Sequence, residues 1–176
     1  RDLVRSRGLG DVYKRQVITC SMADYKFYMI RYGETGASWK DLEAEFPGLR
    51  YKECTGLNAY GEPKNVYSED FAETSKAGVY VSGTPTYKQT SIKLTLVFLE
   101  NDEKDDSAYH GFLDFVSGCK MAYRDTARKR KVLMYLTGAT EPKSDTLKGQ
   151  NYKEVTFAFT NVYGCSFGYD DTFPTE

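Results

Sequence analysis

Apolar and polar residues alternate along much of this chain, which predicts a protein built mainly of β-strands. The clearest case is the segment Thr90 to Leu99, in which apolar side chains occupy every second position. The apolar positions of this segment are Ile92, Leu94, Leu96 and Phe98. A period of two residues is typical of a strand with one buried face. Near its end, Val97 and Leu99 interrupt the polar face, and we expect a second contact there, with a neighbouring subunit.

Further segments with strand signals bring the expected total to seven or eight short strands. They are residues 25–32, 49–54, 78–82, 119–124, 130–136, 153–162 and 165–169. One helix is predicted between Asp106 and Gly118, because its apolar residues fall at i, i+3, i+4 and i+7 and form one stripe. A weaker helical turn is expected within residues 38–46. Since no helix-rich layer is available to cover a parallel sheet, we expect an all-β sandwich or small barrel with one flanking α-helix.

The segment 55–77 lacks a sustained period and is longer than most loops in compact domains. It contains aromatic and aliphatic residues, so it is too apolar for a free linker. Contact with a partner is the favoured interpretation, and packing on its own domain is the alternative. The candidate contact residues in this segment are Tyr60, Lys64, Asn65, Val66, Tyr67 and Phe71.

Residues 123–131 concentrate five positive charges within eight positions. The favoured interpretation is a solvated turn between two strands, in which Asp125 and Thr126 bond to their own backbone. The alternatives are contact with phosphate and, ahead of it, salt links to acidic loops of a neighbouring subunit. For these subunit links the candidate residues are Arg124, Asp125, Arg128, Lys129 and Arg130.

Residues 1–21 show no helical or strand period. They carry five basic and two acidic side chains, and no apolar segment of the length found in a signal peptide follows. Their VYKRQ string resembles translated sequencing-adaptor read-through in metagenomic gene predictions. We therefore expect residues 1–21 to be non-native and disordered, and residues 22–176, beginning at Met22, to form a single domain.

The 176 residues include 24 Lys and Arg against 25 Asp and Glu, and the net charge is -1. A general nucleic-acid binder relies on clustered cations, so this balance argues against one. No stretch approaches the roughly 20 apolar residues that span a bilayer. Aromatic residues make up 15% of the chain, which agrees with a strand-rich fold.

Candidate reaction chemistry is scarce in this sequence. The four cysteines are Cys20, Cys54, Cys119 and Cys165, and none stands at CxxC spacing. There is one histidine, His110, and the acidic run 100–106 lacks the glycine and glutamate of an EF-hand loop. We therefore expect no catalytic residue, no bound metal and no cofactor, and we predict that the protein is not an enzyme.

The order of several segments resembles tail proteins of bacteriophages and prophages, especially those of the tail tube type. The resemblance covers roughly residues 24–168. It rests on the long segment from GLNAYGEPKNVY to VYV, a strand ending LTLVFLEN, the helix AYHGFLDFVSG and the basic pair around YRDTARKRKVLMYL. It also includes a late KGxxY strand that ends in an Asn-x-x-Gly turn, Asn161 to Gly164.

The resemblance implies a structural virion protein that forms a ring, commonly of six subunits, and stacks into a hollow tail tube. DNA would pass through the lumen during ejection without specific binding, and other tail proteins would be further partners. The location would be the virion tail, after synthesis in the cytoplasm of a bacterial host. A tail adaptor, distal tail or terminator ring of the same fold is the first alternative. A carbohydrate-binding β-sandwich, indicated by the exposed tyrosines and Trp39, is the second.

Overall fold

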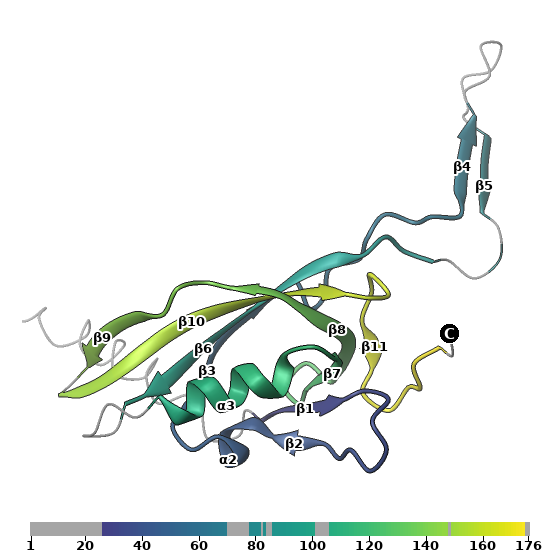
Figure 1. Ribbon diagram of the computed structural model, residues 1–176. Coiled ribbons are helices and arrows are strands. Elements are labelled where there is room, and N and C mark those ends of the chain that lie inside the picture. Colours follow the sequence, from purple (N-terminus) through teal and green to yellow (C-terminus); the bar gives the residue numbers. More distant parts are fainter. Residues whose placement is uncertain are drawn as a thin grey trace, which may run out of the picture.

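A computed structural model describes residues 26–69, 78–81, 83, 86–100, 106–147 and 149–174. An antiparallel sheet curves around one long helix, and a thin pair of strands projects from one end (Figure 1). The N-terminal segment 1–21 lies outside the described residues, so its assignment as read-through stays a prediction.

The main sheet is open and antiparallel throughout its described part. Its spatial order is β2 (Lys40–Asp41), β1 (Phe27–Arg31), β7 (Lys120–Asp125), β8 (Arg130–Ala139), β10 (Gln150–Asn161), β6 (Thr90–Leu99) and β3 (Leu49–Thr55). Two short strands lie off this path: β11 (Phe167–Gly168) pairs with β8, and β9 (Lys143–Leu147) pairs with β10. The predicted fold class, all-β with one flanking helix, is therefore confirmed.

Strand β8 joins the two halves of this sheet and gives it its curvature. Residues Arg130 to Tyr135 pair with β7, whereas Met134 to Ala139 pair with β10. The register shifts between Ala158 and Phe159 of β10, and a bulge of this kind bends a strand. The half with β1 and β7 thus turns towards the half with β10, β6 and β3, and a core forms between them (Figure 1).

The core lies on the apolar face predicted for residues 90–99. Leu94 of β6 pairs with Phe157 of β10, and both side chains are fully buried. Helix α3 (Ser107–Val116) covers this pair with Phe112, whose ring centre lies 4.9 Å from that of Phe157. Phe112 and Val116 are fully buried as well, which confirms the predicted helix and its apolar stripe. Burial of one such large side chain contributes about 1.5–3 kcal/mol.

The helix ends follow the sequence signals only in part. Gly118 has a φ of +72°, the left-handed conformation expected of a residue that ends a helix. Asp106 occupies the N-cap position but makes no capping hydrogen bond with its side chain. The weaker predicted turn is confirmed as α2 (Leu42–Glu45), where the Asp41 carboxylate accepts a hydrogen bond from the Glu43 amide.

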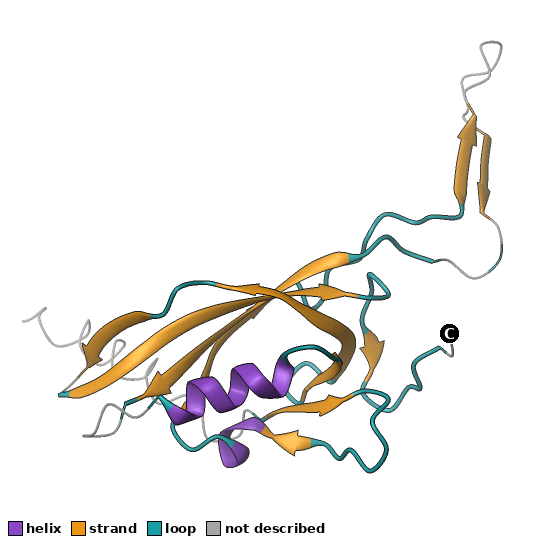
Figure 2. Cartoon of the chain, in the orientation of Figure 1, coloured by secondary structure: helices purple, strands orange, loops and turns teal. Residues whose placement is uncertain are grey.

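The segment that we expected to be a long loop contains a strand. β4 (Val66–Glu69) pairs with β5 (Gly78–Val81) in a two-stranded sheet separate from the main one. Residues 70–77 between them, including Phe71, lie outside the described part of the chain. We call residues 60–69, 78–81, 83 and 86–89 the arm, and Figure 2 shows it projecting beyond the start of β6. β5 lies within the strand predicted at residues 78–82, whereas β4 escaped prediction because it shows no two-residue alternation of its own.

Close backbone packing fixes the base of the arm. The Gly61 amide donates a hydrogen bond of 2.7 Å to the carbonyl of Gly164, and both glycines approach the carbonyl of Lys88. A Cβ atom at Gly61 would lie 1.9 Å from this oxygen, and one at Gly164 would lie 1.8 Å from it. Asn161 holds the turn beside it, because its side chain accepts from the Tyr163 amide and donates to the Cys165 carbonyl. The Asn-x-x-Gly motif therefore anchors the arm.

The substitution Gly164→Ala should lower the free energy of unfolding by about 1–3 kcal/mol. The new Cβ would collide with the Lys88 carbonyl, and the φ of +65° at this position disfavours a side chain. Urea denaturation followed by circular dichroism measures the change. Gly138→Ala is the matched control, since nothing lies within 4 Å of its added Cβ, and it should change stability little. Equal effects of the two substitutions would contradict this account of the arm base.

Candidate functional site

No group of three or more His, Cys, Asp or Glu side chains among the described residues could hold a metal ion. His110, the one histidine of the chain, is exposed on α3. The distinctive features of the surface are instead the arm, two hollows and a cluster of aromatic rings around Arg124.

No helix in the described ranges combines the length and the apolar character that crossing a membrane requires.

Exposed apolar side chains gather on the arm. Tyr60 is 55% exposed, Val66 is 37% exposed and Tyr80 is 67% exposed. They are three of the four large hydrophobic side chains that are exposed in the described part of the chain, and Tyr32 is the fourth. The sequence prediction had named Tyr60 and Val66, but it passed over Tyr80 because Tyr80 lies in the strand that follows the expected loop.

The polar candidates of the arm hold its two segments together. The Lys64 amide donates a hydrogen bond of 2.8 Å to the Thr86 carbonyl, and the Asn65 side chain accepts one of 2.8 Å from the Thr86 hydroxyl. Glu62 and Lys88 form an ion pair of 2.6 Å, and the hydrogen bond from Lys88 lowers the pKa of Glu62. Tyr67 lies on β4. Whether Lys64, Asn65 and Tyr67 also contact another subunit stays a prediction.

Val97 and Leu99 lie in a hollow of about 240 Å³ on the face of the sheet opposite the core. The other residues that line it are Lys52, Gln150, Tyr152 and Glu154. We call this site the apolar hollow. An ion pair of 2.5 Å joins Lys52 and Glu154 at its rim, and this hydrogen bond raises the pKa of Lys52. Val97 and Leu99 thus come together as one partly exposed apolar surface, while their predicted subunit contact stays a prediction.

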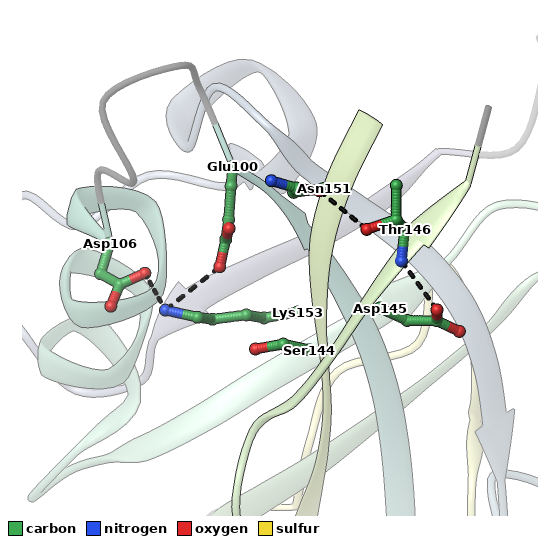
Figure 3. Close-up of a pocket in the computed structure, with 7 residues that line it drawn as sticks. All are labelled: Glu100, Asp106, Ser144, Asp145, Thr146, Asn151 and Lys153. Atoms are coloured by element: carbon green, nitrogen blue, oxygen red, sulfur yellow. Dashed lines mark hydrogen bonds and ion pairs between the residues drawn. The ribbon is translucent and has the colours of Figure 1, made fainter. Parts of the chain in front are cut away.

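A second, polar hollow of about 530 Å³ lies between β9, β10 and the start of α3 (Figure 3). Its centre is Lys153, whose ammonium group lies 2.5 Å from the Asp106 carboxylate and 3.3 Å from that of Glu100. The hydrogen bond to Asp106 raises the pKa of Lys153, which keeps this lysine protonated at neutral pH. A protonated and doubly paired lysine is no nucleophile, so the hollow is structural. It ties together the two ends of the acidic run, whose residues 101–105 lie outside the described ranges.

The basic segment forms the turn that the sequence favoured. The fully buried Asp125 carboxylate accepts hydrogen bonds from the Arg128 amide at 2.9 Å and from the Arg128 guanidinium at 2.8 Å. Thr126 bonds instead to the backbone of Lys26. Asp125 was a candidate for contact with a neighbour; its side chain is buried within its own turn, and the predicted contact stays a prediction. Lys129, with a φ of +50°, lies in the turn, and Arg130 begins β8.

Arg124 is held by aromatic rings, which the sequence did not reveal. Its guanidinium carbon lies 5.0 Å from the ring centre of Tyr28, 4.5 Å from that of Trp39 and 4.4 Å from that of Tyr169. Such contacts contribute about 0.5–2 kcal/mol each. Through these contacts Arg124 of β7 connects Tyr28 of β1, Trp39 just before β2 and Tyr169 just after β11. Trp39 was the residue that suggested carbohydrate binding, and the Arg124 guanidinium covers one face of its ring.

The environment of the described thiols disfavours their reactive, deprotonated form. Burial raises the pKa of Cys54 to about 12 and also raises the pKa of Cys119 and of Cys165, which are only partly buried. The thiolate is the reactive form, so these shifts disfavour nucleophilic chemistry.

No family model matches the chain, and no curated protein matches it. Among solved structures, the chain is similar to chains of the phage p2 baseplate in its activated conformation, one determined with Sr and one with Ca. The TM-scores are 0.51 and 0.50, the identity is 14% in both, and each match covers 76% of this chain and 43% of the other. At this identity the similarity shows the fold.

A further similar structure is the SPP1 Dit (gp 19.1) protein, described as a paradigm of the hub adsorption apparatus in phages that infect Gram-positive bacteria. Its TM-score is 0.49 at 12% identity, and the match covers 81% of this chain and 52% of that protein. The chain thus spans about half the length of these proteins or less. The similarity therefore defines a fold, a β-rich domain that is also present in chains of the phage p2 baseplate.

Cys54 should resist alkylation by iodoacetamide at pH 8 in the folded protein. A pKa of about 12 leaves on the order of one thiolate in 10,000 at this pH, and burial blocks the reagent as well. Mass spectrometry of peptides after timed labelling measures the rate, with Cys119 and Cys165 as the partly exposed internal comparison. In urea, all three should react alike. Rapid labelling of Cys54 without urea would mean that β3 opens easily at the sheet edge.

Proposed function

We propose that this chain is a structural subunit of a bacteriophage tail, that it assembles with copies of itself into a ring, and that such rings stack into the tail tube. The arm is the observation that carries the proposal. It presents exposed apolar side chains on a two-stranded extension, and it is attached to a domain whose fold is similar to that of phage baseplate chains. Such a surface suits contact with another protein chain and needs no reaction chemistry.

The physics of the arm supports an assembled state. A two-stranded ribbon is at best marginally stable alone in water, because it has no further strand or helix to cover it. Apolar side chains that gather on one exposed element mark a site of protein contact. When an arm meets an unlike surface on the next copy, the contact repeats, and it generates a ring if the rotation closes.

In this proposal the tube is the conduit for DNA ejection. We infer a ring of six subunits, further contacts with other tail proteins, and a place in the virion tail after synthesis in the bacterial cytoplasm. DNA would pass through the lumen without specific binding. The charge balance supports this, because a net charge of -1 gives the chain no excess of cations to hold phosphates.

A second candidate is a single closed ring at one end of the tail, such as an adaptor, distal tail or terminator ring. The similarity to chains of the phage p2 baseplate favours it. The two candidates differ in the number of interfaces: a single ring needs only the contact within the ring, whereas a tube also needs a contact between rings.

Electron microscopy in negative stain, over a range of protein concentrations, should reveal assemblies of the purified chain. Long hollow filaments are expected for a tube subunit, since both interfaces are then satisfied. Isolated rings at every concentration would replace the tube by the second candidate. A particle that stays at the monomer mass of 20.0 kDa at all concentrations would contradict both.

Shortening the arm should abolish assembly and leave the domain folded. Replacing residues 64–86 by Asn-Gly retains the facing pair Pro63 and Tyr87 as the ends of a two-residue hairpin, and it keeps the base at Gly61 and Lys88. Circular dichroism should give the wild-type spectrum with a melting temperature within a few degrees, and light scattering should detect only monomer. Assembly at wild-type concentrations would mean that the arm is dispensable.

A further inference from the structure

The arm and the apolar hollow lie at the two ends of one strand. β6 begins at Thr90, directly after the arm, and ends at Leu99, which lines the hollow. Its 10 residues span about 33 Å at the usual rise of a strand. In Figure 1 the arm leaves one end of the sheet, and the start of β10, which also lines the hollow, lies at the other end. The arm of a chain therefore points away from the hollow of the same chain.

We propose that the arm of one copy docks on the apolar hollow of the next copy. The proposal rests on the self-assembly in the proposed function and names the surface that receives the arm. Tyr80, exposed on one face of the arm, meets Val97 and Leu99, which are only half-covered in the isolated chain. The occupant is a second copy, because the arm carries the exposed apolar side chain that fits the hollow, and the arm of the same chain leaves the opposite end of the sheet.

The size of the two surfaces fits a specific contact. Aromatic side chains bury about 150–250 Å² each and dominate such contacts, and Tyr80 on the arm faces a hollow that already contains Tyr152. A volume of about 240 Å³ is enough to take one large side chain and too small for a folded domain.

The charges of the two surfaces are compatible. Lys52 and Glu154 neutralise one another at the rim of the hollow, and Glu62 and Lys88 do so at the base of the arm. The two carboxylates of these pairs are each neutralised by a lysine of the same surface. Contact between the arm and the hollow therefore brings no two unpaired carboxylates of these pairs together. Lys64, near the base of the arm, adds a cation that suits a chain with a net charge of -1.

Two variants test this head-to-tail contact. Tyr80→Lys disables the arm, and Leu99→Lys disables the hollow. Each alone should be monomeric by analytical ultracentrifugation at concentrations where the wild type assembles, with complete loss of larger species. An equimolar mixture should form dimers and nothing larger, because only one intact arm and one intact hollow remain in each pair. Ser91→Lys is the matched control, since Ser91 is exposed on the same face of β6 but outside the hollow.

Other results would overturn the proposal in recognisable ways. Wild-type assembly by Leu99→Lys together with loss of assembly by Tyr80→Lys would locate the receiving surface elsewhere, while the proposed function would stand. Large oligomers in the mixture would exclude a head-to-tail contact. Failure of the wild type itself to assemble would remove the proposed function and this inference together.

Cross-linking gives a second measurement that does not depend on how Leu99→Lys folds. Tyr80→Cys and Leu99→Cys chains, mixed and oxidised, should yield a covalent dimer on a non-reducing gel at several times the level of either variant alone. Equal yields from the mixture and from the single variants would contradict docking at this site.

Discussion

The pairing of β6 with β10 is the interaction on which the rest of the structure depends. Ten residue pairs run from Tyr152 and Leu99 to Asn161 and Thr90, and the buried apolar side chains of both strands point to the same face. On that face lies the core with α3; on the other lie the ion-paired rim and the apolar hollow. The arm enters β6 at one end, so its direction is set by the same ladder. A substitution that broke the pairing of β6 with β10 would loosen the core and displace both the arm and the apolar hollow.

The strength of the local pattern determines what could be predicted from the sequence. Residues 90–99 alternate with a period of two, and the helix of residues 107–116 has a stripe of period 3.6, so each element is specified by its own residues. Of the two arm strands, β5 lies within the strand predicted at residues 78–82, but β4 carries no such pattern. β4 is a strand because it forms hydrogen bonds with β5, which follows it after residues 70–77. The residues of β4 alone do not reveal that β5 supplies these hydrogen bonds.

The same difference between local pattern and folded structure applies to the candidate site residues. Val97 and Leu99 could be found because they break an alternation, which is a local signal. The rings around Arg124 could not be found, since Tyr28, Trp39 and Tyr169 come together only in the folded sheet. There β1 pairs with β2 and β7, β7 pairs with β8, and β8 pairs with β11. Asp125 looked like one charge among many in a basic turn. Its burial follows from the fold, which places it under the turn that it holds together.

The charged side chains that the structure pairs argue for an apolar basis of assembly. Lys153, Lys52, Lys88 and Arg128 each have a carboxylate partner within the chain. Such surface pairs contribute little, about 0–1 kcal/mol, and each neutralises the two charges that form it. β3, the last strand of the sheet, carries the exposed charged residues Arg50, Lys52 and Glu53 along its length, which discourages indiscriminate pairing at this edge. In the proposed assembly the arm and the apolar hollow are the contacting surfaces, and because they differ from one another, each contact leaves one of each open for the next copy.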